Sequence, residues 1–364
     1  MDLYIGLMSG TSMDGIDAAL IEIPSNKLIH GITKKYSGDL SVLLVKLMST
    51  QQISLADLCQ LNVLIGREFA SAVQQLLEEA KYPAAAIKAI GSHGQTVCHD
   101  TKTVIPYTLQ LGCAHTISSL TGIDVVADFR SRDLVNGGQG APFAPLYHQE
   151  LFARYDEHAA IVNVGGIANV TFLSPGQLTR GWDVGPGNCL MDAWISLNQG
   201  KNYDDEGHWA SQGCLIQPLL EQLLADIFFS QPSPKSIGKE YFSLGWLKQH
   251  LKSEYRAVDV QATLLALTAL CVANSVLEAN KGTKKLYLCG GGTHNRQLVN
   301  SLSQLLPNIF VTSVMDLGVN PDYLEAMMFA WLAAQTINLV AVDLSSITGA
   351  STKEILGAVY PIKK

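Results

Sequence analysis

Residues 159–173 read AAIVNVGGIANVTFL, with a glycine pair between two apolar runs. β-Branched residues fill both runs, and such residues favour strands. A glycine pair between two strands favours a tight turn. The stretch therefore predicts a β-hairpin that turns at Gly165 and Gly166.

A stretch near the start of the chain has a related pattern. Residues 3–23, LYIGLMSGTSMDGIDAALIEI, place small and hydroxyl-bearing residues between two apolar runs. The second of these runs, residues 16–23, also fits a helical period. Because the stretch parallels residues 159–173, we interpret it as a second hairpin and not as a strand-to-helix phosphate loop.

The parallel continues, since each half next has a strand that leads into a glycine loop, a further strand and a helix. These segments are residues 87–97, 124–130 and 144–155 in the first half, and residues 284–295, 308–316 and 321–337 in the second. Strands mixed with helices indicate α/β layers. The sequence thus predicts an α/β protein with two similar domains that flank a nucleotide-binding cleft.

The expected boundaries divide the chain near residue 136. The first domain comprises residues 1–135, with residues 338–364 returning to it, and the second comprises residues 136–337. NGGQGAP at residues 136–142 is a candidate hinge, and SQPSPKS at residues 230–236 has the composition of a surface excursion.

The composition argues against several classes of protein. The chain has 364 residues, of which 48% are hydrophobic, and a net charge of −7, which argues against nucleic-acid and anionic-lipid partners. The N-terminus shows no signal peptide, and polar residues interrupt the most apolar run, residues 258–277, so we expect a buried helix there. Seven scattered cysteines without metal-site spacing indicate free thiols. These features predict a cytoplasmic protein.

The glycine loops suggest a nucleotide site, although each glycine alone is equally consistent with an ordinary turn. The glycines are Gly10, Gly15, Gly165, Gly166, Gly290, Gly291 and Gly292. Backbone amides and the hydroxyls of Thr11 and Ser12 can hold phosphates. The first lysine in the chain is Lys27, so a bound triphosphate needs a metal ion. Asp14 could hold Mg²⁺ through water, or it could bond its own turn backbone instead.

RGWDVGPGNCLMDAW, residues 180–194, contains the candidate catalytic carboxylate. We expect Gly185-Pro186-Gly187 to force a turn that leaves Asp183 at the end of a short strand. A general base requires such a rigid position. Asn188 is a suitable N-cap for the helix that follows.

Further polar residues could contact a sugar. SHGQT at residues 92–96 offers Gln95 and Thr96, and DFRSRD at residues 128–133 offers Arg130. Glu325 opens an otherwise apolar helix, where it is either a cleft carboxylate or a helix N-terminal charge.

These motifs resemble a known family. The two halves with their glycine hairpins and GGG loop are similar to the actin, Hsp70 and hexokinase superfamily. The runs GLMSGTSMDGID, GSHGQT, ADFR, VNVGGIANVT, GWDVGPGN and EAMMFAWLA closely resemble the anhydro-N-acetylmuramic acid kinases, in order and over essentially the whole chain. Sugar kinases of the wider superfamily usually have an aspartate in a D-x-G-T pattern where this chain has Met8, as the narrower family does.

The resemblance implies two actin/hexokinase-like (ribonuclease H-like) domains and a cytosolic homodimer that uses ATP and Mg²⁺. The implied reaction opens 1,6-anhydro-N-acetylmuramic acid with water and phosphorylates O6, in the recycling of bacterial cell-wall sugars. Asp183 matches the catalytic aspartate, and Thr96, Arg130 and Glu325 match positions around the sugar. The matching ATP phosphate segment comprises Gly10, Thr11, Ser12, Met13, Asp14, Gly15, Ile16 and Asp17.

Two other functions remain open at this point. An ordinary hexose kinase of the same superfamily would phosphorylate a free hydroxyl without consuming water. A nucleotide-driven scaffold like actin or Hsp70 would hydrolyse ATP without a sugar acceptor.

Overall fold

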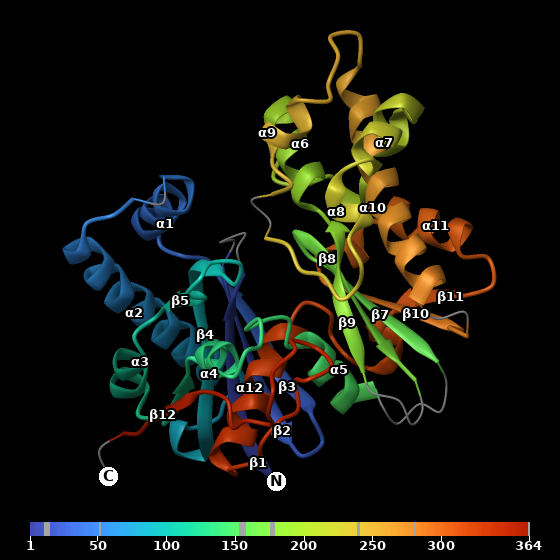
Figure 1. Ribbon diagram of the computed structural model, residues 1–364. Helices are drawn as coiled ribbons and strands as arrows, with labels where there is room; N and C mark the ends of the chain where they lie inside the picture. The colour runs from blue at the N-terminus through green and yellow to red at the C-terminus, as the bar shows by residue number, and fades with distance from the viewer. Residues whose placement is uncertain are drawn as a thin grey trace. The chain divides into compact units, whose positions relative to one another are not determined.

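The computed structural model describes residues 1–10, 15–50, 52–152, 158–174, 179–238, 241–279 and 282–362. The chain divides into two compact units (Figure 1), which are described separately below. Unit 1 comprises Met1–Tyr147 and Tyr323–Lys364, and unit 2 comprises His148–Asp322. The expected boundaries differ from these units, because they assigned residues 136–147 and 323–337 to the second domain.

Unit 1 is built on a mixed sheet with the strand order β12-β6-β4-β1-β2-β3, and β5 pairs with β4 beside this path. The strands are β1 (Asp2–Ser9), β2 (Ile16–Ile23), β3 (Lys27–Lys34), β4 (Ile87–Asp100), β5 (Tyr107–Leu111), β6 (Val125–Ala127) and β12 (Ala358–Tyr360). β1 and β2 pair antiparallel from Asp2 opposite Ile23 to Met8 opposite Asp17. This register confirms the hairpin predicted for residues 3–23.

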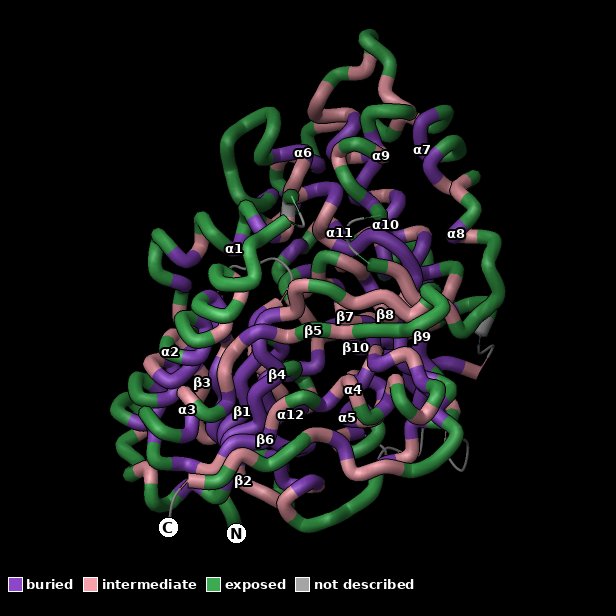
Figure 2. Tube along the Cα trace, turned by 60° about the vertical axis from the view of Figure 1, so that its left-hand side comes forward, coloured by how far each residue is buried: buried purple, intermediate pink, exposed green. Residues whose placement is uncertain are grey.

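Helices cover both faces of this sheet. They are α1 (Gly38–Thr50), α2 (Leu55–Ala80), α3 (Ala114–Thr121), α4 (Phe129–Val135), α5 (Ala144–Phe152), which crosses the unit boundary, and α12 (Leu324–Ile337), with a short 3₁₀ helix at Ala84–Ala86. The apolar side of α2, including Phe69 and Val73, joins Ile5, Leu7 and Leu20 of the strands in one buried core. Figure 2 shows the central strands β1 and β4 as largely buried.

Helix α12 lies directly on the other face of the sheet, on a row of small residues. Gly31, Ala19, Gly6 and Gly91 stand opposite one another across β3, β2, β1 and β4. A Cβ atom on Gly6 would lie 1.7 Å from the carbonyl oxygen of Ala326, and one on Gly91 would lie 1.9 Å from that of Phe329. The helix backbone therefore touches the sheet, which is why residues 323–337 belong to unit 1.

Two further segments of unit 1 differ from expectation. Among the described residues, the expected glycine loop after residue 91 is absent, because β4 continues to Asp100 and pairs with β5. Gly94 lies within this strand at a φ of 76°. The candidate hinge at residues 136–142 is held to unit 1: the Gly140 N–H donates to the buried Asp133 carboxylate at 2.6 Å, and the Gln139 N–H donates to the Thr348 carbonyl at 3.2 Å.

Unit 2 repeats the sheet topology of unit 1. Its strand order is β11-β10-β7-β8-β9, with β7 antiparallel to β8, β8 antiparallel to β9, and β7, β10 and β11 parallel. The strands are β7 (Ala159–Val164), β8 (Ile167–Leu173), β9 (Arg180–Pro186), β10 (Lys285–Cys289) and β11 (Phe310–Ser313). In unit 1, the strands β6, β4, β1, β2 and β3 correspond in this order to β11, β10, β7, β8 and β9, with the same relative directions. This correspondence confirms the duplication and the hairpin at residues 159–173.

The helices of unit 2 enclose a core on one face of its sheet. They are α6 (Cys189–Gln199), α7 (Gln217–Leu224), α8 (Ile227–Ser230), α9 (Leu244–Lys248), α10 (Ala257–Ala279) and α11 (Arg296–Leu305), with 3₁₀ helices at Asp205–Gly207, Ala210–Gln212, Gly291–His294 and Val314–Leu317. α10 has the length and apolarity of a membrane span, yet 67% of that window is buried within the protein. Its side chains, such as Leu264 and Val272, pack on Val170 and Trp182, so the run at residues 258–277 is a core helix as predicted.

The seating of α12 on Gly91 predicts the effect of adding one methyl group. Alanine normally suits a strand better than glycine, but at this position its Cβ would enter the backbone of α12. We expect Gly91→Ala to destabilise the protein by about 1–3 kcal/mol, the usual cost of overpacking, measured as a lower urea midpoint of unfolding. The control is Gly38→Ala, since a Cβ at Gly38 meets nothing within 4 Å. Equal midpoints for the two variants would contradict the role of the small-residue row.

Candidate functional site

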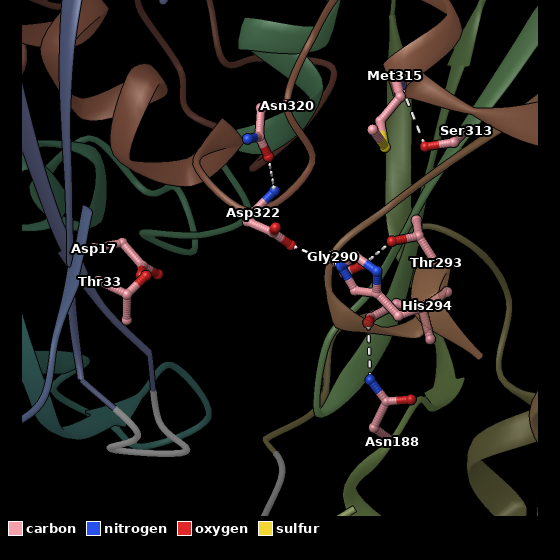
Figure 3. Close-up of polar contacts among 11 residues, drawn as sticks. Asp17, Thr33, Asn188, Gly290, Thr293, His294, Ser313, Met315, Asn320 and Asp322 are labelled. Atoms are coloured by element: carbon pink, nitrogen blue, oxygen red, sulfur yellow. Dashed lines mark hydrogen bonds and ion pairs between the residues drawn. The ribbon is translucent and has the colours of Figure 1, made fainter. Parts of the chain in front are cut away.

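In unit 1, a second row of side chains crosses the same sheet face, two residues beyond the small-residue row. It consists of Met8, Asp17 and Thr33, which oppose one another across β1, β2 and β3. The Thr33 hydroxyl donates to the Asp17 carboxylate at 2.6 Å, and both side chains are labelled in Figure 3. Asp17 thus lies at the end of the hairpin, next to the turn that carries the proposed phosphate segment.

The fully buried Gln95 and Ser9 connect the two ends of that turn. The Gln95 amide nitrogen donates to the Gly10 carbonyl at 3.2 Å, and the amide oxygen lies 2.7 Å from the Ser9 hydroxyl. The Ser9 hydroxyl also lies 2.8 Å from the Gly15 carbonyl. Thr11, Ser12, Met13 and Asp14 lie outside the described residues. Gln95 was predicted to contact the sugar; in the structure its amide group contacts Ser9 and Gly10 at the first end of the turn, and Ser9 connects to Gly15 at the other end.

Arg130 and His93 form a fixed pair beside the same end of the sheet. The Arg130 Nε–H donates to His93 Nε2 at 3.0 Å, and its Nη1 donates to the Gly140 carbonyl at 3.1 Å. Because arginine only donates, Nε2 of His93 accepts, and Nδ1 carries the proton that it shares with the Gly94 carbonyl at 2.9 Å. Burial and the Arg130 charge hold the pKa of His93 well below its usual value, so this imidazole is neutral.

Glu325 lies in the first turn of α12, where the contact of Ala326 with Gly6 fixes its backbone. The surrounding protein and the Asp17 carboxylate raise the pKa of Glu325, and the Arg130 guanidinium opposes this shift. Burial lowers the pKa of Arg130 to about 10, with Glu325 and Asp133 acting in the opposite direction. Asp17, Arg130 and Glu325, which are far apart in the sequence, are therefore electrostatically coupled in unit 1.

Thr96 lies on the same strand as Gln95 but has different neighbours. It pairs with Gln110 of β5, and the Gln110 amide donates to the Thr96 hydroxyl at 3.4 Å. Its side chain is partly exposed, as a contact to a bound molecule requires.

In unit 2, Asp183 lies inside β9 and not at the end of an element, which corrects the expectation. β9 continues to Pro186, which pairs with Ile167, so the expected turn begins later. The Ile237 N–H donates to Asp183 Oδ2 at 2.8 Å, and the Asp183 N–H donates to the Lys235 carbonyl at 2.9 Å. Burial raises the pKa of Asp183 to about 7, although the Ile237 hydrogen bond opposes this shift. A carboxylate with this pKa can take up a proton near neutral pH.

Two asparagines that the sequence reasoning missed share a row with Asp183. Asn163, Asn169 and Asp183 oppose one another across β7, β8 and β9. The Asn169 Oδ1 is buried without a hydrogen-bond partner among the described residues. The signal was present in the sequence, because each asparagine interrupts an otherwise apolar strand on either side of the glycine turn.

The predicted glycine loops of unit 2 gather at the ends of β7 and β10. The carbonyls of Gly165 and Gly166 accept hydrogen bonds from the N–H groups of residues 187–189. A Cβ on Gly290 would lie 2.2 Å from Asn163 Oδ1, and one on Gly292 would lie 2.4 Å from a Val164 methyl carbon, so both positions require glycine.

Side chains around these loops hold backbone carbonyls (Figure 3). The Asn188 amide donates to the Val164 carbonyl at 3.1 Å, and the Thr293 hydroxyl donates to the Gly290 carbonyl at 2.8 Å. Asn188 occupies the N-cap position of α6, as expected, but its side chain makes no capping hydrogen bond there. Gly291 and Asn188 are neighbours, with a Cβ on Gly291 expected 3.7 Å from Asn188 Nδ2.

Within the described residues, no group of three histidine, cysteine or carboxylate side chains is arranged to hold a metal ion. The predicted metal ligand, Asp14, lies outside that part of the chain. Asp17 is the described carboxylate at the end of the same hairpin.

Solved structures of low sequence identity are similar to this fold. A ROK family glucokinase from Streptomyces griseus in complex with glucose and AMPPNP is 11% identical, with a TM-score of 0.42 over 92% of this chain and 99% of that chain. An activator of 2-hydroxyisocaproyl-CoA dehydratase from Clostridium difficile with bound ADPNP is 11% identical, with a TM-score of 0.46 over 94% and 99% of the two chains.

Sequence comparisons give much closer relatives. An anhydro-N-acetylmuramic acid kinase from Legionella pneumophila (strain Lens) is 67% identical over 364 residues, the full length of both chains. One from Coxiella burnetii (strain Dugway 5J108-111) is 47% identical over 360 residues, which cover 98% of this chain and 97% of that protein. The family model for anhydro-N-acetylmuramic acid kinase matches residues 2–362. The chain therefore belongs to the anhydro-N-acetylmuramic acid kinase family and is a sugar kinase.

Proposed function

We propose that the chain uses ATP and water to convert 1,6-anhydro-N-acetylmuramic acid into N-acetylmuramic acid 6-phosphate and ADP. The family supports the substrate and the phosphoryl transfer. The observation that carries the hydrolytic step is Asp183, a carboxylate held by the Ile237 N–H, with its pKa raised to about 7 by burial.

In the proposed reaction, Asp183 acts as the general base. It takes a proton from water as the water oxygen bonds to C1 and the C1–O6 bond breaks, a role carboxylates have in glycoside hydrolysis. The electron pair of the broken bond stays on O6, which bonds to the γ-phosphorus as the bond to ADP breaks. The γ-phosphoryl group thus receives the charge that develops on O6, so one carboxylate is sufficient.

The residues of unit 1 are proposed to bind the two substrates. Residues 10–17 bind the ATP phosphates, and the glycine loops of unit 2 are proposed as further ATP-binding residues. Arg130, Glu325 and Thr96 bind the sugar. His93 and Gly140 engage Nε and Nη1 of Arg130, which fixes the guanidinium plane and leaves Nη2 to donate to a sugar oxygen. Gln95 is also proposed to contact the sugar, and it holds the first end of the phosphate turn through Ser9 and Gly10.

Mg²⁺ is proposed to accompany ATP. This ion keeps several waters and usually binds to phosphates and one or two protein carboxylates. Asp17 is a suitable carboxylate, because it pairs with Met8 at the end of the β1–β2 hairpin, next to the proposed phosphate segment. When bound, the ion would offset the charge of the phosphates. Asp14, the metal ligand expected from the sequence, remains a candidate beside Asp17.

The remaining parts of the proposal follow from the family resemblance. We propose that the protein is a cytoplasmic homodimer that acts in cell-wall sugar recycling, without a nucleic-acid or membrane partner. A molar mass of one chain in solution, measured by light scattering, would contradict the dimer.

Isotope labelling tests the proposed reaction directly. If water opens the bridge, a reaction in H₂¹⁸O with ATP, Mg²⁺ and the anhydro sugar places ¹⁸O at C1 of the product, detected by mass spectrometry. The product is analysed immediately, and a control incubates unlabelled product with the enzyme in H₂¹⁸O, because the free anomeric centre also exchanges with water. An ordinary hexose kinase would phosphorylate a free sugar hydroxyl and incorporate no label. ATP hydrolysis that needs no added sugar would favour the scaffold function instead.

Asp183→Asn should nearly abolish turnover. The amide keeps the shape of the side chain but cannot accept the proton of water, and loss of a general base typically costs about 10²–10⁴-fold in rate. Kinetics should show the loss in kcat, while calorimetry should show that ATP and the sugar still bind. Asp205→Asn, at an exposed carboxylate of the same unit, is the matched control. Near-normal turnover of Asp183→Asn would remove this residue from the role.

Glu325→Gln should weaken sugar binding and leave ATP binding unchanged. The substitution removes a carboxylate acceptor beside Arg130, and losing one charged hydrogen bond typically costs about 1.5–3 kcal/mol. We therefore expect the KM for the sugar to rise about tenfold or more, with the KM for ATP within about twofold. Glu78→Gln, on the exposed side of α2, serves as the control. The opposite pattern, with ATP binding weakened alone, would place Glu325 in the nucleotide site.

A further inference from the structure

Residues 232–238, here called the supporting segment, lie along β9. The segment contacts Asp183 twice: the Lys235 carbonyl accepts from the Asp183 N–H at 2.9 Å, and the Ile237 N–H donates to the carboxylate at 2.8 Å. The composition of residues 230–236 suggested a surface excursion, but the supporting segment, which overlaps them, contacts both the backbone and the side chain of the proposed base.

The side chain of Lys235 attaches the supporting segment to helix α8. Its ammonium group donates to the carbonyls of Phe228 and Phe229 at 2.9 and 3.2 Å. These carbonyls belong to the last turn of α8, where lysine is a common donor, and the Phe228 carbonyl also accepts from the Gln231 N–H at 3.2 Å. The ammonium nitrogen also lies 4.5 Å from the centre of the buried Phe228 ring, within the range of a cation–π contact.

Helix α8 is in turn packed on β9. A Cβ at Gly185, two residues from Asp183, would lie 2.9 Å from Cε1 of Phe229. The Phe229 ring stacks on Phe242, with ring centres 5.7 Å apart. Lys235 therefore closes a loop of contacts that runs from β9 through α8 to the supporting segment and back to Asp183.

We propose that Lys235 is a positioning residue for the reaction, which holds the Ile237 N–H on the Asp183 carboxylate. This inference rests on the proposed function, in which Asp183 is the general base. An N–H donor stabilises the charged form of a carboxylate. Without Lys235, the segment can move away, and a larger fraction of Asp183 is then protonated and inactive at neutral pH.

Other titratable groups near Asp183 do not account for such a change near pH 7. On α10, burial raises the pKa of Cys271 to about 12, so this thiol is neutral. His148 contacts Thr171 of β8, and burial lowers its pKa to about 3. Burial lowers the pKa of Lys235, while Cys271 and Glu278 of α10 act in the opposite direction.

The test is the pH dependence of kcat in the full-length enzyme, measured for wild type, Lys235→Met and Lys235→Arg with ATP and the anhydro sugar. A required base makes the rate fall as the pH decreases through its pKa, so the wild-type acid limb should have its midpoint near pH 7. Lys235→Met should move that midpoint upward by about one pH unit, the typical effect of losing a hydrogen bond to a charged group. Lys235→Arg keeps a cationic donor and should restore the wild-type midpoint.

A second variant separates the hydrogen bond from the charge of Lys235. Ile237→Pro removes the N–H donor and keeps Lys235, and it should move the acid limb in the same direction. An unchanged limb in Lys235→Met or Ile237→Pro, with only lower thermal stability, would overturn the inference and leave Lys235 a structural anchor. That outcome differs from failure of the proposed function, which would appear as retained turnover in Asp183→Asn.

Discussion

The close contact between helix α12 and the row Gly31, Ala19, Gly6 and Gly91 is the constraint on which unit 1 depends. With Ala326 fixed over Gly6, the preceding residue, Glu325, must lie at the end of the sheet beside Asp17. One turn later, the Phe329 ring lies 4.7 Å from His93, the partner of Arg130. Residues without side-chain functional groups thus determine where the proposed sugar-binding residues lie.

Asp183 is supported in a different way. A short segment outside the helices and strands supplies one N–H to its carboxylate and one carbonyl to its own N–H. The carboxylate therefore has a single described donor against a large desolvation effect, and its pKa stays near 7 instead of falling to the range of a well-solvated aspartate. A base with more donors would be easier to hold in place, but it would be a weaker proton acceptor.

The parts of the fold that local patterns determine could be predicted from sequence. Both hairpins and the duplication follow from runs of β-branched residues around glycine turns. The location of α12 could not be predicted, because a helix that is apolar on nearly all sides has no polar face to indicate which sheet it covers. The contact of residues 232–238 with Asp183 could not be predicted either, because every residue except proline has a backbone N–H, so the donor cannot be recognised from the type of side chain. Asn163 and Asn169 could have been found, because a polar residue in an otherwise apolar, buried strand is unusual and points to a specific role.

Comparison of the duplicated sheets supports the two different roles proposed for their carboxylates. At the end of the unit 1 hairpin, the three antiparallel strands carry Met8, Asp17 and Thr33 in one row, and the corresponding row in unit 2 is Asn163, Asn169 and Asp183. In unit 1 the carboxylate is on the middle strand, where Thr33 donates to it at 2.6 Å. In unit 2 it is on the outer strand, where the supporting segment can reach it. In the proposed reaction, the unit 1 aspartate, which accepts from the Thr33 hydroxyl, would bind a metal-bound phosphate, whereas the unit 2 aspartate, whose pKa burial raises to about 7, would take up a proton. The two roles proposed for these carboxylates therefore correspond to different positions within one repeated row.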